Sequence, residues 1–124
     1  NLEVLATALR MSQEIKKSIP VMEKAASKSD KGELYARLAS IYLDADNPKK
    51  AIEAGASALK RGSIKRVDQL QVTLGMAKAN QKQYSAAIKH FKNAAKDKRS
   101  ATFAKGWIKY CQNEMERERK LKAS

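Results

Sequence analysis

The sequence predicts an all-α protein built from repeated pairs of helices, and three observations support this. Of its 124 residues, 20 are alanine and 19 are lysine, while Gly and Pro number only 5 and 2, a composition that favours helices over strands. Apolar residues recur every three or four positions through most of the chain, which is the helical period. The same residue pattern also returns at a constant offset. The length fits one domain over residues 1–124.

The apolar periodicity and the capping residues divide the chain into seven expected helices. Ser18 can cap the second of them and place Pro20 in its first turn, where a proline removes no helical hydrogen bond. Asn47 followed by Pro48 is a strong start signal for the fourth, and Ser100 can cap the last. The expected helices cover about residues 2–15, 18–26, 34–42, 48–59, 67–79, 84–95 and 100–120.

The repeat can be followed through single residues. Four matched pairs share an offset of 36: Leu38 and Leu74, Ala39 and Gly75, Ala51 and Ala87, Ala58 and Ala94. Five residues of the first segment precede their counterparts by 33: Leu2, Leu5, Leu9, Met22 and Ala25. Because the offset holds across both helices of a pair, the pair is the repeating unit, and its small residues allow the two helices to approach closely. We expect units at about 1–31, 32–67 and 68–99 and a capping helix at about 100–121.

The order of these landmarks resembles the tetratricopeptide repeat, a helix–turn–helix of about 34 residues. Tyr35 stands in the tryptophan place of that motif, and Ala39 and Gly75 stand in its glycine place. The pattern departs from the motif at Gln71 and Gly55, which replace aromatic residues, and no proline closes a unit. The resemblance covers about residues 2–98 and implies a right-handed superhelix, or solenoid, of about three helix pairs plus a C-terminal capping helix.

The capping helix has a specific expected contact. A solenoid's last pair exposes an apolar face unless another element covers it. We therefore expect Phe103, Trp107 and Ile108 to pack against the preceding helix pair.

A narrower resemblance concerns the segments Gly32–Tyr42, Lys96–Ser100 and Trp107–Tyr110. They look like envelope tetratricopeptide proteins of Gram-negative bacteria that are assigned to TonB-type energy transduction systems. This resemblance implies a periplasmic location, with the cytoplasm as the alternative. Since the chain starts at Asn1 and no basic-then-apolar leader follows, we expect it to begin inside a longer product.

The sequence offers little for catalysis, and we expect no enzyme activity, no cofactor and no metal site. His90 is the single histidine and is expected on a solvated helix surface. Cys111 is the single cysteine and falls on the apolar side of the last helix, where a buried thiol is expected. One cysteine excludes an internal disulfide, and one histidine with one cysteine cannot form a zinc site.

The positive charge is large and uneven. The net charge is +13, and residues 64–124 carry 15 Lys or Arg against 5 Asp or Glu. Seven lysines in this half recur at helical spacing: Lys78, Lys82, Lys89, Lys92, Lys96, Lys105 and Lys109. They form either a solvated surface or a basic face that attracts acidic proteins, anionic lipid headgroups or phosphates. Specific nucleic-acid recognition is disfavoured because aromatic residues do not alternate with these lysines.

The family resemblance implies that a partner binds in a concave groove lined by the first helix of each pair. By register, the first such helix contributes Glu33, Ala36, Arg37, Ser40, Leu43 and Asp44, and the next contributes Gln69, Val72, Thr73, Met76, Ala79 and Asn80. The apolar members suit a peptide or helix with apolar anchors. The Lys/Asn clamp that some relatives use for chaperone tails is absent, which disfavours a chaperone adaptor.

The sequence is consistent with two functions. The first is a non-catalytic scaffold that binds a protein or peptide partner, but no small-molecule substrate, within a periplasmic TonB-associated assembly. The alternative is a basic module that binds acidic lipid headgroups or nucleic acid. It also stays open whether the groove is filled by the chain's own last helix or by further repeats.

Overall fold

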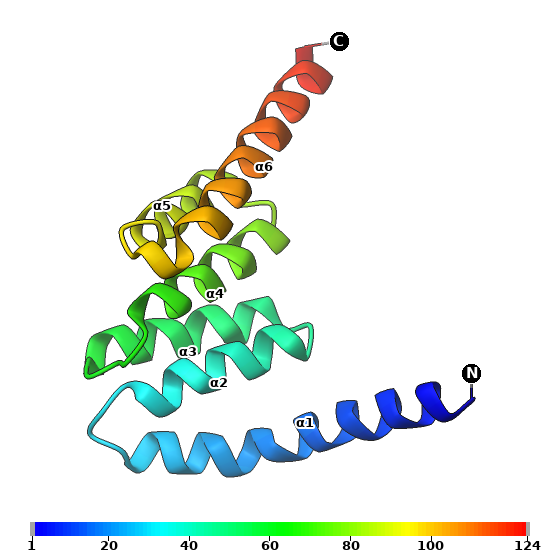
Figure 1. Ribbon diagram of the computed structural model, residues 1–124, viewed down its shortest axis with the longest axis vertical. Helices are drawn as coiled ribbons and strands as arrows, with labels where there is room; N and C mark the ends of the chain where they lie inside the picture. The colour runs from blue at the N-terminus through cyan, green and yellow to red at the C-terminus, as the bar shows by residue number, and fades with distance from the viewer. Residues whose placement is uncertain (1, 124) are drawn as a thin grey trace. The chain divides into compact units, whose positions relative to one another are not determined.

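The computed structural model describes the backbone of residues 2–123 and the side chains of residues 13–123. Over this part of the chain the protein is all-α, with six helices and no strand (Figure 1). This confirms the all-α prediction. The helices are α1 (Leu2–Lys28), α2 (Glu33–Asp44), α3 (Pro48–Arg61), α4 (Val67–Asn80), α5 (Tyr84–Ala94) and α6 (Lys98–Ala123).

The helices form two compact units, which divide between Ile64 and Lys65. In the first unit, α2 and α3 form a hairpin and α1 packs on α2. In the second unit, α4 and α5 form a hairpin and α6 packs on both. Each unit therefore combines one helix pair with one further helix.

The N-terminal part departs from the sequence prediction. A single helix of 27 residues replaces the two short ones, and Pro20 lies inside it. Ser18 is not an N-cap, because its hydroxyl donates to the carbonyl of Ile15 at 2.6 Å, within the helix. A proline inside a helix costs about 3 kcal/mol. Good helix formers on both sides and the packing of α1 on α2 offset this cost, so the expected first helix pair does not form.

The two hairpins repeat at 36 residues in backbone detail. Asp46 and Lys82 occupy the same position in their turns, and both have φ 61°, a left-handed conformation that is uncommon for residues other than glycine. The N–H of Asn47 donates to the carbonyl of Tyr42 at 2.8 Å, and the bond 36 residues later is 2.9 Å long. The register predicted from side chains is thus also the register of the turns.

The start signals are confirmed for α3 and corrected for α6. The side chain of Asn47 accepts a hydrogen bond from the N–H of Lys50 at 3.2 Å, as an N-cap does. At α6, Asp97 takes this role by accepting from the N–H of Arg99 at 2.9 Å, and the helix begins at Lys98. Ser100 lies inside α6, so its predicted role as a cap is wrong. An aspartate is at least as good a cap as serine, and its charge also complements the helix dipole.

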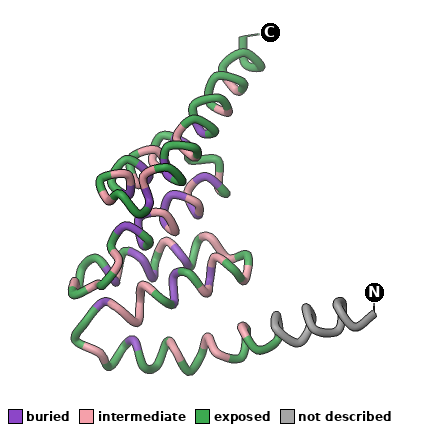
Figure 2. Tube along the Cα trace, viewed as in Figure 1, coloured by how far each residue is buried: buried purple, intermediate pink, exposed green. Residues whose placement is uncertain are grey.

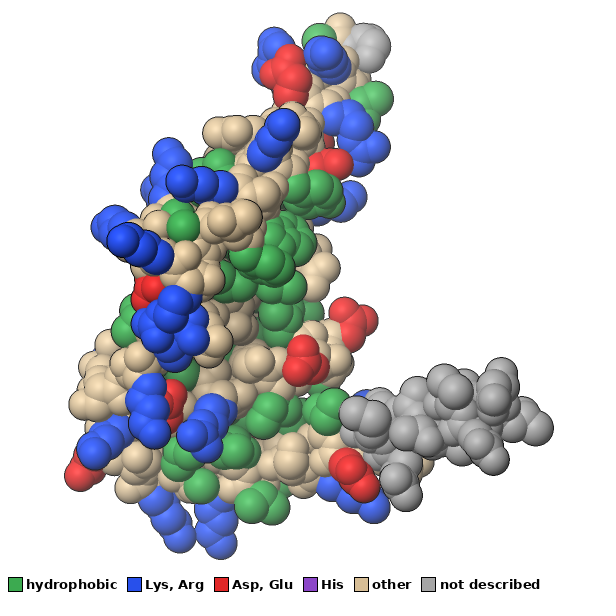
Figure 3. All heavy atoms as spheres, in the orientation of Figure 1, with side chains coloured by type: hydrophobic (Ala, Val, Ile, Leu, Met, Phe, Trp, Pro, Cys, Tyr) green, Lys and Arg blue, Asp and Glu red, His purple; other side chains and the backbone are tan. Residues whose placement is uncertain are grey.

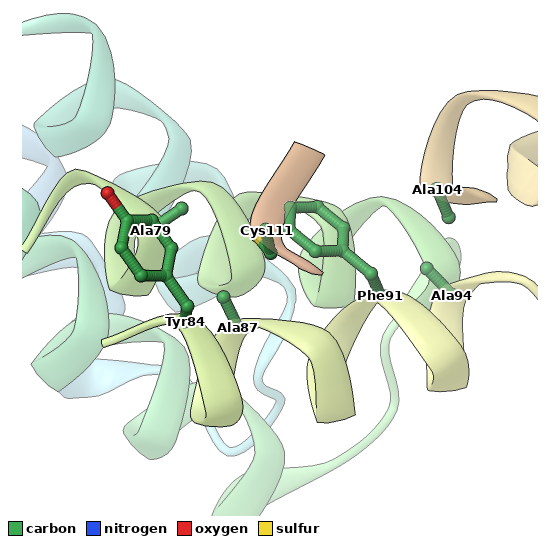
Figure 4. Close-up of a cluster of buried hydrophobic side chains, with 7 residues drawn as sticks. All are labelled: Ala79, Tyr84, Ala87, Phe91, Ala94, Ala104 and Cys111. Carbon is green, nitrogen blue, oxygen red and sulfur yellow. The ribbon is translucent and has the colours of Figure 1, made fainter. Parts of the chain in front are cut away.

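Small residues lie where the paired helices touch, as the repeat predicts. Ala51 and Ala87 are both fully buried. A Cβ added to Gly75 would come within 2.8 Å of the Phe91 ring, so the ring fills the space that the glycine leaves. Buried segments lie on the sides where helices face one another (Figure 2). In Figure 4, Tyr84, Ala87, Phe91 and Ala94 follow one another along α5, close to Ala79 of α4 and to Ala104 and Cys111 of α6.

The packing of α6 agrees with the expected cap in part. Trp107 stacks on Phe91, with ring centroids 5.4 Å apart, and both Trp107 and Ile108 pack against the buried cluster. Cys111 is fully buried, as predicted. Phe103, however, is 53% exposed. It precedes the buried Ala104 by one residue, which turns it about 100° away from the line of contact.

Candidate functional site

The α2 part of the expected groove lies along one face of the helix, because its members are three or four residues apart. None of the six is buried. Arg37, Ser40 and Asp44 are exposed, and Glu33, Ala36 and Leu43 are partly exposed. The structure thus leaves all six predicted residues of α2 at least partly exposed.

The α4 part of the groove is only partly accessible. Gln69 and Asn80 are exposed, and Thr73 is partly exposed. Val72 and Met76 are partly buried against the cluster formed by residues of α4, α5 and α6, so only part of each side chain is open to solvent.

The prediction is wrong for one member of the α4 set. Ala79 is 7% exposed and belongs to the buried cluster with Tyr84. It precedes the turn after which the chain folds back as α5, so its side chain is enclosed by its own hairpin. The structure brings the members of each set together on one helix, and the two sets belong to different units.

A buried charged cluster, which sequence reasoning missed, joins the start of α4 to the start of α6. The Asp68 carboxylate accepts two hydrogen bonds from Arg66, at 2.6 and 2.8 Å, and one from the Ser100 hydroxyl at 2.6 Å. The Arg66 guanidinium holds the pKa of Asp68 well below its usual range. Because these donors already engage both carboxylate oxygens, the cluster is a structural link. The repeat could have indicated that Asp68 is buried, since it stands 36 residues after Gly32, which is also buried.

His90 is not on a solvated surface, which corrects the prediction for it. Its side chain is partly buried, and Nδ1 lies 2.7 Å from the side-chain oxygen of Gln71 on α4. Burial, together with the charge of Lys78, lowers the pKa of His90, so the ring is neutral at pH 7. A neutral imidazole bonded to an amide joins α5 to α4.

No group of three or more His, Cys, Asp or Glu side chains in the described part of the chain is placed to hold a metal ion.

A hollow of about 340 Å³ lies between α1, α2 and α3. Its walls include the rings of Tyr35 and Tyr42, and both rings already have a cation from the chain itself. Arg61 lies 4.7 Å from the centre of the Tyr35 ring, and Lys50 lies 5.8 Å from that of Tyr42. Tyr42 also donates a hydrogen bond to Glu23 of α1. Burial and this carboxylate raise the pKa of Tyr42 to about 12, so the phenol keeps its proton and holds α1 to the hairpin.

The second unit carries an exposed aromatic surface, which we call the α6 aromatic face: Thr102, Phe103, Gly106, Trp107 and Tyr110. These residues line a hollow of about 430 Å³. Tyr110 is 47% exposed and meets Trp107 edge to face, with ring centroids 5.4 Å apart. Figure 3 shows hydrophobic side chains gathered beside the lower part of α6 and Lys and Arg side chains on both sides of this helix. Sequence reasoning assigned Phe103 and Trp107 to the cap and did not identify the exposed surface.

In comparisons with known proteins, no protein-family model and no curated protein matches the sequence. Within the described residues, none of the helices is both long enough and apolar enough to span a bilayer.

Proposed function

We propose that this chain is a non-catalytic protein-interaction scaffold of the tetratricopeptide type. The observation that carries the proposal is the agreement of two hairpins at an offset of 36 residues, in buried side chains and in the hydrogen bonds of their turns. Repeated hairpins of this kind stack into a right-handed solenoid and place their first helices on the concave side. The first helices of the two hairpins are α2 in one unit and α4 in the other.

The chemistry of the two faces suits a peptide or helix rather than a small molecule. Arg37, Ser40 and Asn80 are exposed polar groups that can fix a partner's orientation. Leu43 is a partly exposed apolar anchor, while Val72 and Met76 are partly buried against the hydrophobic cluster and expose only part of their surface. The periplasmic, TonB-associated setting is part of the proposal through the sequence resemblance alone.

Partner capture from an envelope extract tests the groove. The double variant Arg37→Glu with Ser40→Arg changes two exposed residues of α2, so the fold is expected to persist while capture falls by about tenfold. The matched control, Lys60→Glu with Ala56→Arg, alters two exposed residues of α3 and is expected to leave capture unchanged. Substitutions of Val72 or Met76 would disturb the core as well and are less informative.

The alternative, a basic module for anionic surfaces, is favoured by one observation. Lys89, Lys92 and Lys96 are all exposed in a half of the chain with 15 basic and 5 acidic residues. Replacing all three by Glu should slow association with a groove-bound partner but not abolish it. If the lysine variant loses capture, the groove variant keeps it and affinity falls steeply with salt, the basic face is the functional surface.

A further inference from the structure

Helix α6 occupies the register of the first helix of another pair. Cys111 follows Ala39 and Gly75 at steps of 36 residues, and all three are buried. The next position to compare is that of Leu38 and Leu74, which are 2% and 3% exposed in their hairpins. Its counterpart on α6, Tyr110, is 47% exposed. The side of α6 that a second helix would cover is therefore open.

The open side contains a notch. Gly106 stands 36 residues after Leu70, which is 3% exposed inside its hairpin. A Cβ added to Gly106 meets no atom within 4 Å. The surrounding residues of the α6 aromatic face leave a hollow of about 430 Å³, and the stack of Trp107 on Phe91 fixes one of its walls. The notch thus has room for a large apolar side chain supplied from outside.

The segment of α6 that forms the notch is basic. The segment from Lys98 to Asn113 contains Lys98, Arg99, Lys105 and Lys109 and no acidic residue. Lys105 and Lys109 are exposed one helical turn apart. The helix α3, which covers α2 within this chain, is itself basic, with four Lys or Arg against one Glu. A second copy of α3 would be repelled here, whereas an acidic helix is attracted.

We propose that the α6 aromatic face docks an acidic amphipathic helix of a partner protein. The docked helix takes the place that α3 and α5 hold on α2 and α4, inserts one large aliphatic side chain at Gly106, and places carboxylates against Lys105 and Lys109. This surface is separate from the groove of α2 and α4, and docking here does not require that groove to be functional.

The single tryptophan of the chain, Trp107, lies in the wall of the notch and reports binding through its fluorescence. The probe is a side-chain-stapled helical peptide of roughly 14 residues, since an unstapled one would be marginally helical. It carries a central Leu, Ala one turn to each side and Glu on the flanks, and no Trp. We expect a saturable change of Trp107 emission that weakens about tenfold when the Leu is replaced by Ala and disappears when the Glu residues are replaced by Lys. An acidic peptide that produces no saturable change overturns the proposal.

Filling the notch from within separates binding from folding. Gly106→Leu places a side chain in open space, so the thermal midpoint should stay equal or rise while peptide affinity falls about tenfold or more. Tyr110→Ser is a second variant that should weaken binding without adding volume. Lys105→Glu with Lys109→Glu should also weaken binding, whereas the matched pair Lys89→Glu with Lys92→Glu on α5 should not.

Two further outcomes contradict the proposal. One is unchanged affinity in both Gly106→Leu and Tyr110→Ser. The other is a dimer in sedimentation that Gly106→Leu dissociates, because the occupant would then be a second copy of the chain. The groove variant Arg37→Glu with Ser40→Arg should bind the peptide normally, so this surface and the groove can fail independently.

Discussion

The two units attach a third helix to the same kind of hairpin in different ways. In the first unit, polar contacts help to hold α1: Tyr42 donates to Glu23, and Arg61 donates to the carbonyl of Ala26, at 3.0 Å, and to that of Ser29 just after the helix. In the second unit, α6 is held mainly by apolar contacts, with Phe91 stacked on Trp107 and with Ala104 and Cys111 fully buried.

One repeat position differs sharply between the two hairpins. Gly55 of α3 and Phe91 of α5 are equivalent at the offset of 36. The phenylalanine ring fills the space beside Gly75 and offers its other surface to Trp107. A glycine offers no such surface, and in the first unit the third helix packs on α2 instead. The ring of Phe91 thus serves both its own hairpin and the added helix, a contact that Gly55 cannot make.

The largest expected effect comes from removing that side chain. Phe91→Ala should lower the free energy of unfolding by about 3–5 kcal/mol, because it creates a cavity beside Gly75 and removes the stack with Trp107. Urea unfolding followed by circular dichroism measures it. The control Leu59→Ala, at a residue of α3 that is 41% exposed, should stay within about 0.5 kcal/mol. Equal effects of the two substitutions would contradict the proposed importance of Phe91.

A matched pair of substitutions compares the two hairpins directly. Ala51→Leu and Ala87→Leu each overpack a fully buried contact, at an expected cost of about 1–3 kcal/mol in the free energy of unfolding. The cost should be greater for Ala87, because it lies in the cluster with Phe91, where the neighbouring side chains have little room to move. The same denaturant titration measures both, with Ala56→Leu at an exposed site of α3 as the control. Unchanged midpoints for both variants would argue against the repeat register.

The smallest effect concerns the polar link that the second unit adds to its apolar packing. Asp68→Asn should cost roughly 1–2 kcal/mol at neutral pH by weakening the bonds from Arg66 and Ser100. Since Arg66 lowers the pKa of Asp68 in the folded state, this stability is fully present above the unfolded pKa of about 4 and is lost as pH falls through the lower folded pKa. The difference between wild type and variant should therefore shrink below about pH 4. Asp30→Asn, at an exposed connector residue, is the control, and a pH-independent difference would contradict this role of the charge.

The features that could be predicted from the sequence are those that local signals determine. Helical periodicity predicted the all-α class, and the repeated small residues predicted the burial of Ala51 and Ala87. The dipeptide Asn47-Pro48 predicted the start of α3, because capping involves only neighbouring residues. Pro20 was ambiguous, since a proline is accommodated either in a first turn or, at a cost, inside a long helix. Tertiary packing decided that case.

The candidate surfaces depend on contacts between distant residues and were harder to predict. The hydrogen bond between Asp68 and Ser100 joins residues 32 positions apart, and no pattern of neighbouring residues predicts it. The apolar stripe of α6 identified Trp107 as a packing residue but could not show that Phe103 and Tyr110 face away from the hairpin. Likewise, Ala79 fits the groove by register, and only the position of Tyr84 shows that it is enclosed.

Cys111 gives the second unit a built-in measure of local opening. It is the single thiol of the chain, it is fully buried, and burial raises its pKa. A thiol reagent can therefore react with it only after α6 separates from α5 or the unit unfolds. When reclosing is faster than the chemical step, the ratio of the observed labelling rate to that of a free thiol is the equilibrium constant for this opening. The labelling kinetics of this one native thiol thus give the free energy of separating α6 from the rest of its unit.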